Sequence, residues 1–436
     1  MSFNRIRLIG ALVSVLTFAT LTNAADWPRF RGPNGTGIAD DKTIPAKWTN
    51  ENFLFKTELP GKGHSSPIVS KGKVFLQASS DDAKERYLIC VDAKSGKIDW
   101  AKPVAAKAAR THQKNSLSSC TPAADGERIY AIYWEGQDAA TAGKKDPKVG
   151  PLSTGNLVLT AFDYSGNQKW RQELGSFTSQ HGPGMSPVVV GDKVIVNDDQ
   201  DGKAELMAFD AKTGKPAWSK KRDHERACYS TPFLLEKTDA GPELLVVSTG
   251  GVTGYDPKDG TEIWNYIWKF NKARLRTVGS AIFHQGTIFA ISGDGGGDRN
   301  MIAVKPGSKG EVPASNLIWK KTTGTAYVPT PVAKDGLVFW VTDKEGVAVC
   351  ADAKTGEEVW NERLGGGAEV SASMVMVDGK IYVINEKGSV FVYPAAKEFQ
   401  LLARNELNES VFATPAIADG RMYVRGAKHL FCIGTK

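Results

Sequence analysis

The sequence is poor in the residues that most often mark a chemical site. It contains five cysteines and six histidines among 436 residues, with no adjacent cysteine pair and no Cys-x-x-Cys spacing. Zinc-binding and haem-attachment motifs need such spacings, so neither is predicted. No Ser-His-Asp order and no phosphate-binding glycine loop stands out either. The sequence therefore indicates no catalytic residue and no metal ligand, although distant residues can still converge in a fold.

Strong charge and long apolar segments are lacking as well. The formal net charge of +7 is mild for this length, and a hydrophobic content of 41% is ordinary for a globular protein. Nucleic-acid binding and a membrane bundle are therefore not expected. One apolar run, Leu8 to Leu21, follows Arg5 and Arg7, which is typical of a signal peptide over residues 1–24. The run is short for a membrane span, and no cysteine follows it for a lipid anchor. We expect an exported protein, periplasmic, cell-surface or secreted, with no transmembrane segment in the mature chain.

One short pattern recurs through the chain. It reads Asp-Ala-Lys-Thr-Gly in its fullest form, as at Asp352 to Gly356, and a Trp follows four residues after the Gly. Five copies keep this offset, and they end at Trp100, Trp170, Trp218, Trp264 and Trp360. A tight turn between two strands explains the pattern, because Gly permits positive φ and Asp caps backbone donors. The Trp is expected to fill the wedge between neighbouring units. The pattern therefore indicates architecture rather than a site.

The segments between these copies share one order of elements. A small residue begins a short apolar strand, a Gly turn leads to a second strand, and a polar loop precedes the third strand, the Asp-Gly turn and the fourth strand. Eight such starts occur, at Ser66, Thr121, Ser186, Thr231, Ser280, Thr330, Ser373 and Thr414. Four-stranded units at this period are typical of a β-propeller, and no segment sustains a helical period. We predict an all-β fold, an eight-bladed β-propeller of four-stranded antiparallel blades.

The two ends of the repeat array complement each other. The last repeat stops after its third strand, at residues 429–433, whereas residues 52–59 read as an extra strand before the first start, with Phe55 at the Trp position. We predict that this N-terminal strand completes the last blade and leaves no open sheet edge. The expected division is a lead-in at residues 25–50, rich in Gly and Pro and packed on the body, and a propeller at residues 51–436.

The cysteines fit the repeat pattern. Cys90, Cys350 and Cys432 occupy the same place in three repeats, the strand before the Asp-Gly turn, where other repeats have Ala or Gly. They are predicted to be small buried residues. Cys120 and Cys228 lie near the starts of other strands, and whether they form a disulfide stays open, since export would permit one.

The Asp-Ala-Lys-Thr-Gly-x-x-x-Trp repeats resemble those of the PQQ-type propeller superfamily over roughly residues 51–436. That superfamily contains quinoprotein dehydrogenases and the non-enzymatic outer-membrane assembly lipoprotein BamB. The lead-in from Trp27 to Gly35 and the run from His112 to Ser116 are similar to exported PQQ-repeat proteins of planctomycete-like bacteria. The resemblance to BamB implies shape rather than role, because the anchor cysteine of the lipoprotein has no counterpart here.

The enzymatic branch of the superfamily would imply a cofactor. Its members carry an adjacent Cys–Cys disulfide beside PQQ, and calcium held by a Glu and an Asn near a catalytic Asp. This sequence has no adjacent cysteines, and none of its positions matches the calcium ligands or the catalytic Asp. Some soluble quinoproteins lack the cysteine pair, so PQQ and calcium stay as cofactors of an alternative function.

Binding is expected on one face of the ring. The Gly turns are short and lie on one face, whereas the loops between blades and between strands two and three lie on the other, the longest running from Gly136 to Gly155. Segment 265–277 has four basic residues and no acid, so a basic mouth would select anions. The candidate site residues at this mouth are His64, His112, Asn115, His181, His224, Arg226, Tyr229, Arg274 and Arg276.

Two acidic loops partly resemble calcium sites. The loop at residues 197–202 would need a Glu at its twelfth position and has Ala208, and the loop at residues 294–298 brings two acids close. Both fall where a hairpin between strands two and three is expected, so we interpret both as plain hairpins.

These observations favour an exported, non-catalytic binding or scaffold propeller, with a partner or ligand at the loop-rich mouth of the central channel. The alternative is a PQQ-dependent, quinoprotein-like oxidoreductase, and a further alternative is a cell-surface module that binds acidic glycan. The expected partner is a protein or an anionic small molecule or glycan, and the chain is expected to be monomeric.

Overall fold

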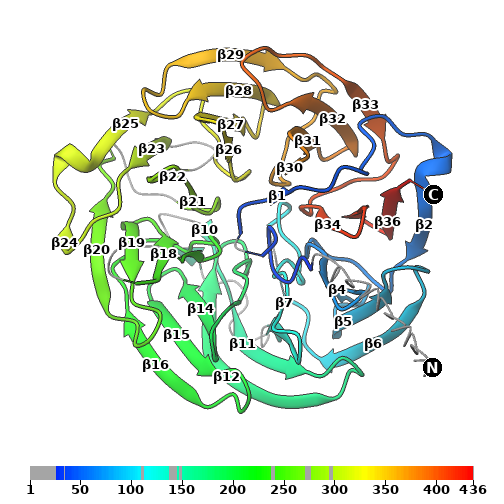
Figure 1. The fold of residues 1–436 in the computed structure, drawn as a ribbon. Coiled ribbons are helices and arrows are strands. Elements are labelled where there is room, and N and C mark those ends of the chain that lie inside the picture. Colours follow the sequence, from blue (N-terminus) through cyan, green and yellow to red (C-terminus); the bar gives the residue numbers. More distant parts are fainter. Residues whose placement is uncertain are drawn as a thin grey trace, which may run out of the picture.

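The computed structural model describes residues 26–33, 35–109, 112–136, 145–146, 150–236, 241–270, 276–293 and 298–435. They form a ring of eight four-stranded antiparallel blades around a central channel (Figure 1). The predicted fold class is therefore confirmed. The expected signal peptide, residues 1–24, lies outside the described residues. None of the helices in the described part of the chain has the length and hydrophobicity that a membrane span requires.

Each blade runs from an inner strand at the channel to an outer strand at the rim. Blade one is β3 (Ile68–Ser70), β4 (Lys73–Ser79), β5 (Glu85–Asp92) and β6 (Ile98–Ala105). Blade two is β7 (Ala123–Ala124), β8 (Ile129–Trp134), β11 (Ser153–Phe162) and β12 (Gln168–Ser179), with β9 (Lys145–Asp146) and β10 (Gly150–Pro151) paired separately. Blade three is β13 (Val188–Val190), β14 (Lys193–Asp199), β15 (Ala204–Asp210) and β16 (Pro216–Lys221). Blade four is β17 (Phe233–Leu235), β18 (Glu243–Val247), β19 (Gly251–Tyr255) and β20 (Glu262–Ile267), with β24 (Gly310–Glu311) added outside.

The second half of the ring follows the same order. Blade five is β21 (Ile282–His284), β22 (Thr287–Ser292), β23 (Asn300–Val304) and β25 (Leu317–Lys321). Blade six is β26 (Val332–Lys334), β27 (Leu337–Val341), β28 (Val347–Asp352) and β29 (Glu358–Arg363). Blade seven is β30 (Val375–Val377), β31 (Lys380–Ile384), β32 (Ser389–Pro394) and β33 (Ala403–Glu406), with β1 (Ile38–Ala39) parallel to β30. Blade eight is β34 (Ala416–Ala418), β35 (Arg421–Arg425), β36 (His429–Gly434) and β2 (Phe53–Glu58). In the described part of the chain, the short 3-10 helices η1 (Asn50–Asn52) and η3 (Ala314–Asn316) lie between strands.

The N-terminal strand closes the ring. β2 pairs antiparallel with β36, and Phe55 faces Cys432 across the two strands. The same facing pair in a complete blade is Cys350 and Trp360, so Phe55 occupies the Trp position as predicted.

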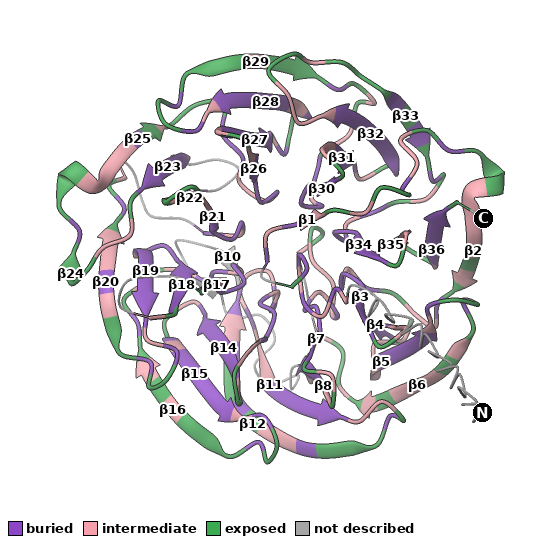
Figure 2. Cartoon of the chain, viewed as in Figure 1, coloured by how far each residue is buried: buried purple, intermediate pink, exposed green. Residues whose placement is uncertain are grey.

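Burial follows the radial position of each strand. The residues of β27 are all buried, whereas β29 at the rim is mostly exposed (Figure 2). The runs of Val, Ile and aromatic residues in the second and third strands thus become the core between blades. Burial of this apolar surface contributes about 25 cal/mol per Å² to folding.

The repeated corner joins each blade to the next. Trp170 of blade two donates through Nε1 to the backbone oxygen of Ala211 in the Asp-Gly turn of blade three, at 3.0 Å. Gly214 of that turn has φ of +73°, and a Cβ there would lie 2.5 Å from the Trp170 ring. The turn therefore needs Gly for its backbone angle and for the close approach of the indole.

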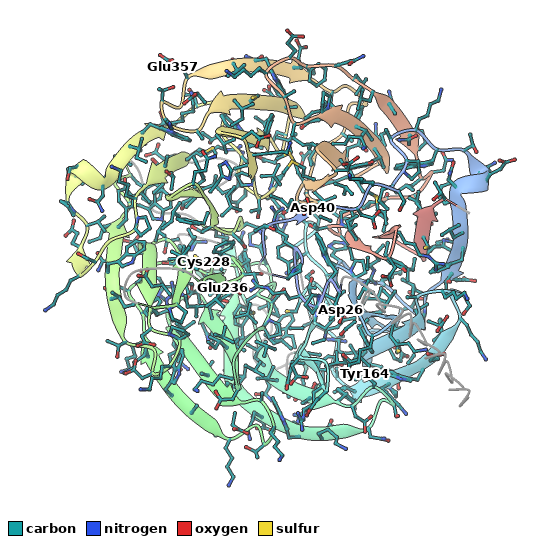
Figure 3. The ribbon with its side chains drawn as sticks, viewed as in Figure 1. Asp26, Asp40, Tyr164, Cys228, Glu236 and Glu357 are labelled. Atoms are coloured by element: carbon teal, nitrogen blue, oxygen red, sulfur yellow. The ribbon has the colours of Figure 1, made fainter. Side chains whose placement is uncertain are left out.

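The cysteines are all buried and free. Burial raises the pKa of Cys120 and of Cys228 to about 12, so neither thiol is reactive near neutral pH. Cys228 lies on the inner side of the ring, whereas Glu357, beside the Asp-Gly turn of blade six, lies at the rim (Figure 3). The open question of a Cys120–Cys228 disulfide is thus answered by two separate thiols.

The eight small residues that start the blades are linked around the channel by a series of seven hydrogen bonds. The backbone N–H of one start residue donates to the side-chain hydroxyl of the next, as in Ser280 to Thr330 at 3.1 Å and Thr330 to Ser373 at 3.0 Å. The links run in order from Thr231 through Ser280, Thr330, Ser373, Thr414, Ser66 and Thr121 to Ser186. We call these residues the hydroxyl ring. It satisfies backbone donors that would otherwise face the channel without partners.

The lead-in runs across one end of the channel (Figure 1). Arg29 donates to the backbone oxygen of Pro232 in blade four at 2.5 Å, and Arg31 donates to that of Met374 in blade seven at 2.8 Å. Both arginines are buried. Residues 26–33 and 35–48 therefore tie distant blades together and leave the opposite end as the open one.

Candidate functional site at the channel mouth

The open end of the channel forms a cavity of about 520 Å³. Its walls are the segments that lead into the inner strands, together with the loop between β27 and β28. Phe30 of the lead-in and residues of the hydroxyl ring, such as Thr330, also line it. The cavity thus lies on the loop-rich face, and we call its rim the mouth. A volume of this size is in the range of small-molecule sites.

Most of the candidate residues line this cavity, and some do not. His64, His112, Asn115, His181, Tyr229 and Arg276 are among its lining residues. His224 lies within 2.5 Å of the Gln200 backbone oxygen through Nε2, and Arg226 donates through Nε to Asp201 at 3.1 Å. Those two side chains are held by the hairpin loop of blade three instead. Arg274 lies outside the described residues, as do residues 137–144 and 147–149 of the longest loop.

Residues 112–119, between blades one and two, cross part of the mouth, and we call them the strap. Asn115 donates through Nδ2 to the backbone oxygens of His181 and Pro183, at 2.9 and 3.0 Å. Lys114 extends to blade seven, where its Nζ lies 2.7 Å from Glu369 and 2.6 Å from Glu386. The strap is therefore fixed on both sides of the mouth.

Two histidines of the cavity, His64 and His181, are held in the neutral form. Burial and, to a lesser extent, the nearby charge of Arg276 together lower the pKa of His181 to about 3. Burial likewise lowers the pKa of His64 to about 4, and its ring stacks on Phe412 with centroids 4.3 Å apart. The rings of His112 and His181 also lie 4.3 Å apart. At neutral pH His64 and His181 therefore offer hydrogen bonds and aromatic surface rather than positive charge.

Charge is distributed unevenly around the cavity. On the side of blades three to five, Asp201 lies near two arginines, Arg226 and Arg276. On the side of blade seven, Glu369 and Glu386 share one lysine, Lys114. One wall therefore carries a surplus of positive charge and another a surplus of negative charge.

The first acidic loop is a plain hairpin, as interpreted from the sequence. β14 and β15 pair directly up to Asp199 and Ala204. Both carboxylate oxygens of Asp199 accept from Nη1 of Arg222, each at 2.5 Å. Burial raises the pKa of the neighbouring Asp198 to about 7. Neither acid is arranged for calcium. Residues 294–297 of the second acidic loop lie outside the described residues.

Calcium beside PQQ, as in the quinoprotein enzymes, does not fit the described residues. No group of three or more His, Cys, Asp or Glu side chains among them could hold a metal ion. The acids of the cavity wall are already bound, Asp343 by Arg299 and Glu369 by Lys114. We therefore derive no chemistry through such a group.

Several features of the mouth were not expected from the sequence. The pairing of Lys114 with Glu369 and Glu386 joins residues far apart in the chain, and no local pattern marks it. The hydroxyl ring did leave a signal, because Ser or Thr stands at every one of the eight starts. Phe30 was not among the candidates, and it lines the cavity because the lead-in crosses the channel.

Known proteins resemble the chain in sequence and in fold. The family profile described as outer membrane protein assembly factor BamB matches residues 46–145, 149–362, 309–398 and 344–433. The BamB of Shewanella oneidensis is 21% identical over 220 residues, which span 49% of this chain and 51% of that protein. The BamB of Yersinia pestis is 22% identical over 313 residues, 68% of this chain and 71% of that protein.

Two solved structures have a similar fold. The BamB of Moraxella catarrhalis superposes with a TM-score of 0.58 at 15% identity, covering 88% of this chain and 99% of that one. A europium-containing methanol dehydrogenase gives a TM-score of 0.53 at 12% identity, covering 93% and 90%. At such low sequence identity, the superpositions show only that the chain shares the propeller fold. The sequence profile, which matches most of the chain, shows more: the chain belongs to the family of PQQ-repeat β-propellers described as outer membrane protein assembly factor BamB.

Proposed function

We propose that this chain is an exported, non-catalytic binding or scaffold propeller that receives a partner or ligand at the mouth of its channel. The observation that carries the proposal is the cavity of about 520 Å³, whose walls differ from blade to blade on a scaffold that otherwise repeats. Non-repeating loops on a rigid scaffold are the usual place for binding. The family name, an assembly factor, supports binding over catalysis.

The proposal also includes the cellular location. The apolar run from Leu8 to Leu21 behind Arg5 and Arg7 supports export, and the described residues contain no helix suited to a membrane span. Export would place the mouth in the periplasm or at the cell surface, where an envelope protein or a small anionic molecule could reach it.

Two lysines in blade six offer a matched test. Lys344 lines the cavity, between β27 and β28, whereas Lys354 lies in the Asp-Gly turn between β28 and β29 on the opposite face. Both side chains are exposed. A photoreactive benzoylphenylalanine would replace each lysine in turn, and the folded proteins would be irradiated in envelope extract of the source organism.

Crosslinked products specific to position 344 are expected, because only that position faces the proposed site. Both variants should unfold at the temperature of the parent protein, which excludes trivial misfolding. Equal products from both positions, or products from position 354 alone, would show that the mouth is not the binding face.

A further inference from the structure

Arg276 differs from the other buried arginines that face carboxylates. Nη1 of Arg222 contacts both oxygens of Asp199 at 2.5 Å, and Arg299 binds Asp343 through two nitrogens at 2.6 and 3.0 Å. Arg276 has no such pair. Its Nη2 lies 3.8 Å from Asp201, beyond hydrogen-bond distance, and donates at 2.9 Å to the neutral amide of Gln180.

Asp201 is also occupied by other donors. It accepts from Arg226 Nε at 3.1 Å, from the Ala227 backbone N–H at 3.0 Å and from the Gln180 backbone N–H at 3.2 Å. Arg276 Nε has no hydrogen-bond partner among the described residues. The Arg276 side chain is only 5% exposed, so its charge is poorly compensated in a poorly hydrated place. Such burial is costly unless an anion supplies the missing partner.

The remaining buried arginines either bond to backbone oxygens or lie away from the cavity. Arg31 donates to several backbone oxygens, and so does Arg86, to those of Trp134 and Lys107. Arg29 and Arg425 are incompletely bonded, but neither belongs to the described cavity lining. Arg276 is thus the under-compensated arginine of the cavity wall.

We propose that Arg276 anchors the carboxylate of a small organic acid that occupies the cavity. The inference rests on the proposed function, because it names the ligand chemistry of the same site. Two arginines share the carboxylate of Asp201, so a single carboxylate of a ligand would supply the partner that Arg276 lacks. A planar carboxylate also fits the guanidinium fork.

The surroundings of Arg276 suit such a ligand. His181 lines the same wall, and its Nδ1 has no partner in the described part of the chain. The ring of Tyr229 lies 6.3 Å from that of His181. The lining also has apolar and aromatic members, Val278 and Phe412 among them. The cavity can therefore take an acid with a flat apolar body.

Benzoate is a suitable probe, because benzamide has the same shape without the charge. Binding of both to the mature protein would be measured by calorimetry in low-chloride buffer, with the imidazole signals of the six histidines followed by NMR. The same measurements would be made on Arg276→Gln. The control is Lys387→Gln, an exposed lysine of the β31–β32 loop on the same face, whose Nζ donates to the Gly367 backbone oxygen.

We expect benzoate to bind the parent protein at least ~10-fold more tightly than benzamide, the scale of one charge-assisted contact. Arg276→Gln should abolish that preference, and Lys387→Gln should keep it. At neutral pH, bound benzoate should also shift the imidazole signals of His181, because both would lie at the same wall of the cavity. This last measurement uses the parent protein, so it decides the matter even if Arg276→Gln fails to fold.

Equal binding of benzoate and benzamide would overturn the anion assignment and leave the cavity as a binding site. A benzoate preference that survives in Arg276→Gln would assign the anion to other residues, and absence of benzoate binding up to its solubility limit would reject the inference outright. None of these results bears on the crosslinking at positions 344 and 354, which tests the proposed function independently.

Discussion

The turns on one face of the ring repeat, and the loops on the other do not. In the Asp-Gly turns, Asp210 accepts from the backbone N–H of Thr213 at 2.7 Å, and Asp352 accepts from that of Thr355 at 2.9 Å. These bonds hold the pKa of both carboxyls below the usual range. At the mouth, Lys114 takes its acidic partners from another blade. Local contacts thus define the scaffold, and contacts between distant segments define the site.

Two buried arginines, Arg222 in blade three and Arg276 at the mouth, provide the largest expected contrast. Arg222→Gln should cost about 3–5 kcal/mol of unfolding free energy, because it leaves Asp199 charged and buried without its partner. Arg276→Gln should change stability by less than about 1 kcal/mol, since Arg276 lacks a dedicated carboxylate. Urea unfolding of both variants checks this. A loss at Arg276 as large as that at Arg222 would mean that Arg276 serves folding.

The repeated corner should be the next most sensitive place. Gly214→Ala should cost about 2–4 kcal/mol, because the residue has φ of +73° and its Cβ would lie 2.5 Å from Trp170. Gly191→Ala is the control, with φ of +58° and open space around it, and should cost about 1–2 kcal/mol. The two unfolding curves would be compared directly. Equal losses would show that the indole contact adds nothing to the backbone effect.

The hydroxyl ring should contribute less at each position. Thr330→Val keeps the shape but removes the acceptor for the backbone N–H of Ser280, so a loss of about 1–2 kcal/mol is expected. Thr355→Val, in an exposed turn, should stay within about 0.5 kcal/mol of the parent protein. Thermal and urea unfolding would both be recorded. If the two variants behave alike, the hydroxyl ring does not stabilise the fold.

The smallest expected effect is a pH dependence from His181. Its pKa is about 3 in the fold and 6.5 in the unfolded chain, so the unfolded state binds more protons between these values. The stability that the neutral His181 side chain contributes to the fold is fully present above pH 6.5 and is lost as the pH falls toward its folded-state pKa. Between pH 7 and pH 6 the loss should be roughly 0.7 kcal/mol, and His181→Gln should remove it. If the unfolding free energies of the parent and the variant changed equally with pH, this prediction would be contradicted. Asp198 titrates in both proteins, so its contribution cancels in the comparison.

The fold could be predicted because its signals are local. The Gly-to-Trp offset, the starting Ser or Thr and the missing last strand each lie within a few residues of sequence. The pairing of β2 with β36 then follows, since an unpaired edge in an otherwise closed ring is unfavourable.

The site could be predicted only as far as topology determines it. Loops that leave the same face of a propeller converge at its mouth, which is why His64, His181 and Arg276 meet at one cavity. Their partners depend on side-chain geometry. His224 was expected at the cavity, but the backbone oxygen of Gln200 lies against it in the hairpin of blade three. Lys114 was not a candidate, because its acids lie in a distant blade.

The strand that closes the ring also determines how the ring would respond to force. β2 and β36 are antiparallel, and the start of β2 at Phe53 lies opposite the end of β36 at Ile433. Tension applied between Phe53 and Ile433 would therefore load the hydrogen bonds between the two strands from one edge and break them one after another. Such a pull would not shear the strands, which would require many hydrogen bonds to break together. The pairing of β2 with β36, which completes the propeller, is therefore also where it would open under this force.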